Sequence, residues 1–330
     1  MKKKIYFTSK PNKIGGGGTF QIGFQKWLSK NTEYRIDYLN FKNKKKKHDI
    51  VFIMHGTKKI ISLLFHKIFG NKIILRMDGF FEDYRFQNPF YTLNGLKHNL
   101  SCLYSIVIAD KIIMQSNFSY NHLSFVSKIF KHKISIIRNG VNLNTFKPKK
   151  NNKKIFNKIL ITEGGIVSEY AKNIIESLSI INLFPVSIYG KIHKILKKKV
   201  RHNNYLNIKF HGAVKRGLMP KVYQNHDIFI CAEHNSTCPN SVLEAMSSGL
   251  PIIGFDNGSL KELVGDAGLI IKLEKKLENT DKEIIANLLK KSIKTISGNY
   301  IQYSQKARER AKTFDANLVF DKYFKILTIN

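Results

Sequence analysis

Short runs of β-branched and other apolar residues alternate with segments of helical periodicity along almost the whole chain. In the helical segments, apolar residues recur three and four positions apart, whereas the short runs are continuous, as in buried strands. This alternation predicts parallel sheets covered by helices, so the chain is expected to be an α/β protein. The predicted strands are 4–9, 34–40, 49–54, 72–76, 111–115, 133–137, 158–162, 186–189, 207–211, 227–231, 251–253 and 269–271.

A polar run over residues 149–157 separates two stretches that each show this alternation. At 330 residues the chain exceeds one ordinary hydrophobic core and suits two domains. We expect Rossmann-like, doubly wound domains over residues 1–148 and 149–314, facing each other across a cleft. Residues 315–330 have a helical pattern with more apolar side chains than one helix face needs, so we expect them to pack back on the N-terminal domain.

The charge is strongly positive: 56 basic and 23 acidic residues give a formal net charge of +33. Such a charge suits an anionic membrane surface, a phosphorylated substrate or nucleic acid, although a compositional bias towards lysine explains it equally well. The lysines occur in scattered clumps without an arginine-rich or aromatic-interleaved module, so nucleic acid is not an expected partner. The basic amphipathic segment 58–69 could instead lie on a membrane surface.

The cysteine content and the apolar runs bear on location. The three cysteines, Cys102, Cys231 and Cys238, show no metal-ligand spacing and fit a reducing cytoplasm. No apolar run approaches the roughly 18 residues of a membrane span, and the first residues predict a strand rather than a secretory signal. We therefore expect a cytoplasmic protein, attached at most peripherally to the inner face of the cell membrane.

Four consecutive glycines, residues 15–18, follow the first predicted strand and precede a helix predicted over Thr19 to Ser29. Glycines at such a junction let backbone amides approach a phosphate, which makes Gly16 and Gly17 candidate ligands of a bound diphosphate. The pattern is not a strict G-x-G-x-x-G, and a flexible turn after the strand remains the alternative.

Charged residues stand where two other predicted strands end. Arg76 and Asp78 follow the strand at 72–76, and His55 follows the strand at 49–54. Side chains at the carboxyl edge of a parallel sheet point into its ligand crevice. Asp78 is therefore a candidate catalytic residue, with an ion-paired turn as the alternative.

Four longer segments carry recognisable motifs. They are PNSVLEAMSSGLPIIGFDNGSLKELVGDAGLII (239–271), IIRNGVNLNTFKP (136–148), ADKIIMQSNFS (109–119) and FHGAVKRGLMPKVYQNHDIFICAE (210–233). The first contains an E-A-M block, a G-x-P turn before a strand, and E-L-V. Together these segments resemble the family 4 retaining glycosyltransferases with the GT-B fold, whose donor-binding region combines the same three motifs.

The resemblance implies a donor site centred on Glu244, which would bind the ribose diol of a nucleotide. The amides of Asn240, Ser241 and Val242 and the turn at Gly258 would face the phosphate or the sugar. From the residues alone, Ser241 and Glu244 also form the S-x-x-E spacing of a helix capping box.

The family pairs two glutamates eight positions apart, and the first would fall on Ser236 here. Either Ser236 or Glu233 would then bond a donor sugar hydroxyl, and Glu233 is a catalytic candidate. Lys172 matches the family lysine that binds the leaving diphosphate, with a solvated lysine as the alternative. The sequence has no evident Asp-x-Asp metal motif, so we expect no metal and no cofactor, and cations and helix N-termini would stabilise the leaving group.

The resemblance thus predicts a metal-independent glycosyltransferase. It would move a sugar from a nucleotide-sugar to a glycan or lipid-linked acceptor in the biosynthesis of cell-surface polysaccharide or lipopolysaccharide. A nucleotide-sugar epimerase or a phosphorylase of the same fold is one alternative, although no cofactor-lysine motif of a phosphorylase is evident. A polyanion-binding protein with a degenerate transferase site is another.

Overall fold

The computed structural model describes residues 3–11, 16–40, 48–79, 89–149, 158–166, 168–192 and 206–329, although without the side chains of residues 89–94, 164–166 and 192. The chain divides into two compact units, residues 1–140 with 316–330 (unit 1) and residues 141–315 (unit 2). The division falls earlier than residue 148, where the composition of the sequence changes. Phe146 is buried in the core of unit 2, and its carbonyl accepts a hydrogen bond from Arg308 at 2.9 Å. These contacts join residues 141–148 to unit 2.

Unit 1 is built on a six-stranded parallel sheet with the order β2-β1-β3-β4-β5-β6. The chain order reverses between β1 and β3, which makes the carboxyl ends of these two strands the switch point of the sheet. The elements are β1 (Lys4–Phe7), α1 (Gly16–Asn31), β2 (Arg35–Tyr38), β3 (Ile50–Met54), α2 (Ile60–Ile68), β4 (Lys72–Met77), α3 (Pro89–Ile108), β5 (Lys111–Met114), α4 (Asn117–His122), α5 (Ser124–Ile129), η2 (Lys131–Lys133), β6 (Ile134–Ile136) and α13 (Ala316–Thr328).

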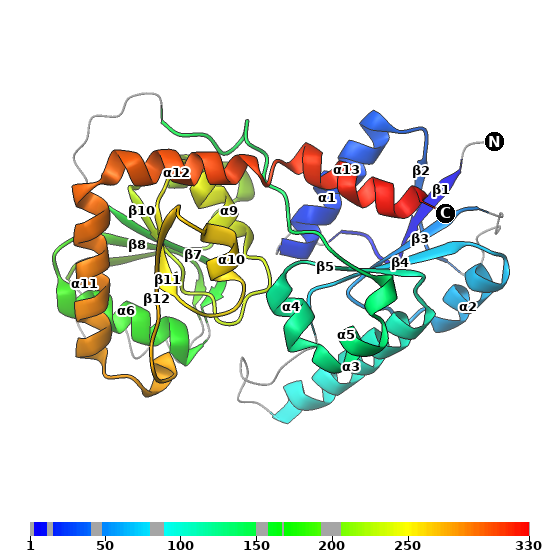
Figure 1. Ribbon diagram of the computed structural model, residues 1–330, viewed down its shortest axis with the longest axis horizontal. Coiled ribbons are helices and arrows are strands. Elements are labelled where there is room, and N and C mark those ends of the chain that lie inside the picture. The colour runs from blue at the N-terminus through cyan, green and yellow to red at the C-terminus, as the bar shows by residue number, and fades with distance from the viewer. Residues whose placement is uncertain are drawn as a thin grey trace. The chain divides into compact units, whose positions relative to one another are not determined.

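Helices cover both faces of this sheet because alternate strand residues are apolar on each side (Figure 1). One face buries α1 and α13, and the other buries parts of α2, α3 and α5. Phe320 of α13 packs on Phe20 and Phe24 of α1 with ring centroids 5.7 and 5.5 Å apart. The prediction that the C-terminal helix packs on the N-terminal domain is therefore confirmed.

Unit 2 is built on a second six-stranded parallel sheet with the order β12-β11-β10-β7-β8-β9. Its switch point lies between β7 and β10. The elements are β7 (Ile159–Ile166), α6 (Glu169–Ile181), β8 (Val186–Ile192), β9 (Ile208–Gly212), η3 (Arg216–Leu218), α8 (Met219–Gln224), β10 (Ile228–Ile230), α9 (Asn240–Ser247), β11 (Ile252–Phe255), α10 (Leu260–Val264), β12 (Gly268–Ile271), η4 (Leu277–Asn279), α11 (Lys282–Gly298) and α12 (Tyr300–Lys312). The predicted α/β class and the two doubly wound sheets are confirmed.

Three local predictions were wrong. The helix predicted over 19–29 begins at Gly16, so Gly16 and Gly17 lie in its first turn. The helical pattern of residues 117–130 predicts a single helix, whereas the structure divides it at Leu123 into α4 and α5. The strand predicted over 158–162 continues as β7 to Ile166, with a register shift between Thr162 and Gly165. Its neighbour Gly190 (φ +141°) permits this, since a Cβ there would lie 1.8 Å from the Glu163 carbonyl oxygen.

Candidate functional site

The loop that follows β10 at the switch point of unit 2 contains Glu233, and the first turn of α9 contains Ser241. The Ser241 hydroxyl donates a 2.6 Å hydrogen bond to Glu233 Oε1. The N-cap of α9 is Pro239, and no side chain caps this helix. The capping-box interpretation of Ser241 and Glu244 is therefore wrong, and both side chains are left for other contacts.

A second loop, at residues 257–259, holds the segment after Glu233 in place. The Asn257 side-chain amide donates to the Glu233 carbonyl at 3.1 Å and to the Tyr170 hydroxyl at 2.9 Å. The Ser259 amide donates to the Ser236 carbonyl at 2.9 Å. Gly258 has φ +59°, and a Cβ there would lie 2.6 Å from the same carbonyl oxygen. Gly258 is thus required for the close approach of the two loops.

Glu244 is almost completely buried, with 3% of its surface exposed. Both of its carboxylate oxygens accept hydrogen bonds from the Arg216 guanidinium, one of them at 2.9 Å and the other shorter. Burial raises the pKa of the Glu244 carboxyl, and the bonds from Arg216 oppose part of that rise. The Arg216 guanidinium also lies over the Phe146 ring, 5.1 Å from its centroid. The carboxylate predicted to bind ribose is therefore already engaged in a bidentate ion pair.

Sequence reasoning did not identify Arg216. The residue stands in η3, 28 positions before Glu244. Its side chain keeps 47% of its surface exposed, while its partner is buried. An arginine among 56 basic residues carries no local signal of this pairing.

Lys172 lies in the first turn of α6, after the N-cap residue Ser168. Its ammonium group is 2.8 Å from Glu169 Oε2 and 4.0 Å from Glu176 Oε1. A cavity of about 660 Å³ beside it is lined by residues of α6, η4 and α11, including Glu278 and Lys282. Among the described residues, none of the other predicted donor ligands lines that cavity. The structure thus gives Lys172 two carboxylate partners on its own helix.

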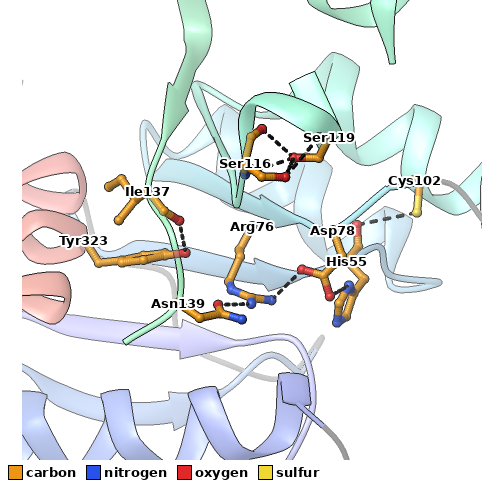
Figure 2. A network of polar contacts seen from close by, with 9 residues as sticks. All are labelled: His55, Arg76, Asp78, Cys102, Ser116, Ser119, Ile137, Asn139 and Tyr323. Atoms are coloured by element: carbon orange, nitrogen blue, oxygen red, sulfur yellow. Dashed lines mark hydrogen bonds and ion pairs between the residues drawn. The ribbon is translucent and has the colours of Figure 1, made fainter. Parts of the chain in front are cut away.

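The strand ends of unit 1 carry a polar network (Figure 2). Arg76, with 1% of its surface exposed, donates to Asp78 Oδ1 at 3.0 Å and to Asn139 Oδ1 at 2.9 Å. Its guanidinium also lies 4.3 Å from the Phe20 ring centroid. The other oxygen of Asp78 is 3.1 Å from His55 Nδ1. Asp78 therefore connects a buried cation to a histidine at the neighbouring strand end.

His55 stands directly after β3, at the switch point of this sheet. It has a left-handed backbone (φ +65°), which costs free energy in a residue other than glycine. Its Nε2 atom faces the start of α1, because a Cβ built on Gly17 would lie 2.9 Å from it. One ring nitrogen thus points at Asp78 and the other at the predicted glycine-rich turn. The strained position and the two polar neighbours mark His55 as the strongest functional candidate of unit 1.

Two further groups border this histidine. The Cys102 thiol lies 3.6 Å from the His55 carbonyl oxygen and 3.5 Å from His98 Nε2. Burial raises the pKa of Cys102 to about 11, so this thiol is protonated near neutral pH, and burial lowers the pKa of His98. Neither residue was a candidate from the sequence.

An open cavity of about 1060 Å³ lies beside the carboxyl ends of β1 and β2. Three lysines, Lys10, Lys58 and Lys59, are among its lining residues. Among the described residues, no group of three or more His, Cys, Asp and Glu side chains is placed to hold a metal ion. No described helix is long and apolar enough to cross a membrane.

One protein family model matches part of the chain. Residues 167–290 match the family model described as glycosyl transferases group 1. No curated protein sequence matched the chain.

Solved structures match over nearly the whole length. Sucrose-phosphate synthase from Thermosynechococcus elongatus has a TM-score of 0.75 at 12% identity, covering 98% of each chain. HepE from Anabaena, in complex with UDP-glucose, has a TM-score of 0.71 at 14% identity, covering 98% of this chain and 99% of the other. WaaG, a glycosyltransferase involved in lipopolysaccharide biosynthesis, has a TM-score of 0.68 at 14% identity, covering 99% and 100%. At these sequence identities, the structural similarity shows that the chain shares the fold of these proteins, with two doubly wound units.

Proposed function

Since the chain is a glycosyltransferase with a group 1 domain and the GT-B fold, we propose that it transfers a sugar from a nucleoside diphosphate sugar to a glycan or lipid-linked acceptor with retention of configuration. A UDP-sugar is the first donor to test, because HepE, of similar fold, was solved with UDP-glucose. The likeness to WaaG supports an acceptor in lipopolysaccharide or another cell-surface polysaccharide. This acceptor would be reached from the cytoplasmic face of the membrane.

The observation that carries the donor half of the proposal is a buried carboxylate near the switch point of unit 2. Glu244 projects from α9, the helix that follows the β10 loop, and accepts two hydrogen bonds in the bidentate geometry that a ribose diol also offers. Because the guanidinium of Arg216 already bonds both carboxylate oxygens, we propose that the nucleotide takes its place. The exposed half of Arg216 lets it swing into solvent or onto the nucleotide.

The leaving diphosphate gains negative charge as the glycosidic bond breaks, and it needs donors aimed at that charge. We assign this role to the amides of Asn240, Ser241 and Val242, to those of Gly16 and Gly17, and to Lys172. For Lys172 the assignment requires that its ammonium group leave Glu169, a surface ion pair worth about 1 kcal/mol or less. Gly258 would hold the adjoining loop in reach of the sugar.

Glu233 and Ser236 would bind the donor sugar. Glu233 accepts a hydrogen bond from Ser241, which orients its carboxylate, whereas Ser236 presents a hydroxyl from the loop that Ser259 holds. In the acceptor half, Asp78 would orient His55 rather than react itself, because its oxygens are shared between His55 and Arg76. We therefore propose that His55, rather than Asp78, contacts the substrate in unit 1.

The first experiment measures thermal stabilisation by nucleotides. We expect UDP or a UDP-sugar to raise the melting temperature, since a ligand at 100 times its Kd stabilises by about 2.7 kcal/mol. GDP and ADP with their sugars complete the panel. The proposal fails if none of the nucleotides stabilises the protein.

Variants at Glu244 localise the effect. Glu244→Gln keeps the shape of the side chain and removes the charge, so it should abolish the nucleotide-induced shift. Glu262→Gln makes the same chemical change on the neighbouring helix α10, and this variant should retain the nucleotide-induced rise in melting temperature. A shift that survives in Glu244→Gln would place the nucleotide elsewhere.

The net charge favours one other function, binding to a polyanion. Such binding loses affinity steeply as salt increases and needs no nucleotide diphosphate. Titration with DNA at two salt concentrations separates it from the transferase, and we expect only weak, salt-sensitive binding.

A further inference from the structure

One outer face of unit 1 is unusually apolar. It is formed by α2, α3 and α5, and we call it the three-helix face. Of the 21 large apolar side chains exposed in the described part of the chain, 12 lie on these helices or at the end of α2. The most exposed include Ile61, Ile68, Leu96, Leu100, Val107 and Phe125, with 77% of Ile68 and 75% of Phe125 in solvent. More than half of the exposed apolar groups are thus concentrated on three helices.

The three helices lie side by side (Figure 1). The Tyr104 hydroxyl of α3 donates to the Ile60 carbonyl at the start of α2. Lys133 of η2, the short helix that follows α5, donates to the Val107 carbonyl at the end of α3 at 3.4 Å. Side chains of α3 and α5, Ile106 and Val126, share one core cluster beneath them. The exposed apolar groups therefore lie on neighbouring helices on one side of the sheet.

The exposed apolar side chains are not the ones that pack these helices onto the sheet. On α3, Leu96, Leu100, Leu103 and Val107 form an exposed stripe at helical spacing, while Cys102 and Ile106 face the core. An ordinary surface helix is polar on its outer side. The outward stripe of α3 is therefore available for an external apolar partner.

The charges of the three-helix face have one sign. The segments 58–69, 89–108 and 117–133 contain no aspartate or glutamate, whereas they contain Lys58, Lys59, Lys67, Lys97, Lys128, Lys131 and Lys133. Asp110, which follows α3, is paired with Lys67, and Asp78 acts electrostatically on His98 and Cys102 of α3. An apolar stripe bordered by lysines is complementary to the surface of an anionic bilayer. The apolar side chains would contact the acyl chains, and the lysines would contact the lipid phosphates.

We propose that the three-helix face is a docking surface for an anionic phospholipid bilayer. The exposed leucines and isoleucines insert at the boundary between headgroups and acyl chains, and the lysines contact lipid phosphates. A second copy of the chain is a poorer partner, because a twofold contact would bring two all-positive faces together. Nucleic acid offers nothing to the apolar stripe. The docking surface does not depend on the proposed transfer reaction.

Vesicle co-sedimentation of the full chain tests this surface. We expect binding to vesicles of phosphatidylcholine mixed with phosphatidylglycerol, at least tenfold weaker binding to phosphatidylcholine alone, and loss of binding as salt increases. Each lysine removed from the face, as in Lys97→Ala or Lys128→Ala, should weaken binding by roughly fivefold. Ile68→Glu and Leu100→Glu should each weaken it by more than tenfold.

Matched controls lie in unit 2. Ile284→Glu changes a half-exposed isoleucine on α11, and Lys290→Ala removes an exposed lysine from the same helix. Both should bind vesicles like the unaltered protein, and all variants should keep their melting temperature because the side chains are exposed. Absence of binding to anionic vesicles at low salt would overturn the proposal. So would equal losses in the controls, or a dimer in sedimentation that Leu100→Glu dissociates.

Discussion

The buried carboxylate of Glu244 is stabilised by Arg216. A carboxylate removed from water is costly unless it is paired, and the guanidinium supplies that pairing. Under the proposed function, the hydroxyls of a nucleotide would take the place of the guanidinium donors. The carboxylate would then keep its hydrogen bonds when the nucleotide binds.

Replacing Arg216 by alanine should destabilise the protein in a pH-dependent way. At neutral pH the loss of the charged hydrogen bonds should cost about 2 kcal/mol. Burial already raises the pKa of Glu244 above 4.5, and loss of Arg216 removes the groups that oppose the rise. The folded state then binds the proton more tightly than the unfolded state, so stability falls as pH increases from about 4.5 through the raised pKa.

Thermal melts at about pH 5 and about pH 7.5 test whether the stability of Arg216→Ala falls as the pH increases. The deficit of Arg216→Ala relative to the unaltered protein should be smaller at the lower pH, and Arg216→Ala with Glu244→Gln should recover stability at the higher pH. Lys215→Ala removes the same charge from the adjacent exposed position and should change little. A deficit that is independent of pH would mean that Glu244 is not the group left unpaired.

At the scale of the element, α13 shows how a helix far along the chain completes a core. Its aromatic side chains fill the space above α1, and Tyr323 donates to the Ile137 carbonyl at the end of β6. Gly23 of α1 lies against the Phe320 ring, 3.1 Å from a hypothetical Cβ, so the two helices approach closely. Unit 1 is therefore incomplete without residues 316–328.

Phe320→Ala should destabilise unit 1 by about 3–4 kcal/mol, since it removes a buried ring from an aromatic cluster. Urea denaturation followed by the fluorescence of Trp27 measures this, because the only tryptophan lies 6.3 Å from Phe320 by ring centroids. Leu318→Ala, on the exposed side of the same helix, should cost about 0.5 kcal/mol or less. Equal effects of both variants would mean that α13 does not contribute a packed face.

For the molecule as a whole, the net charge of +33 sets the response to salt. Like charges repel within a compact chain, and salt screens them beyond roughly 10 Å at about 0.1 M. Ion pairs such as Lys172 with Glu169 are weakened by the same screening, but 23 acids can offset fewer than half of the 56 basic residues.

The melting temperature should therefore rise by a few degrees between about 0.05 and about 0.3 M KCl, and NaCl should act alike. Differential scanning fluorimetry without nucleotide measures this. A melting temperature that falls with salt would show that local ion pairs outweigh the overall repulsion.

Local patterns in the sequence were sufficient to predict the class of fold. Buried parallel strands must be apolar along their length and the helices between them amphipathic, so composition and spacing alone indicated two α/β sheets. The same local signals correctly placed most strands, and the resemblance at 239–271 identified the family that the group 1 match confirms. They misjudged the start of α1 and the course of β7, where backbone packing against distant residues decides the conformation.

The partners of the candidate residues were decided only by the tertiary structure. Arg76 and Asn139 are 63 positions apart, and Arg216 and Glu244 are 28 apart. Nothing in the sequence around any of these residues specifies which strand ends and loops will meet. The sequence determined which segments are strands and helices, because that depends on neighbours within a few residues. The order of the strands in each sheet determined which charged residues face one another. These residues are far apart in the sequence and become neighbours only when the strands and loops pack together.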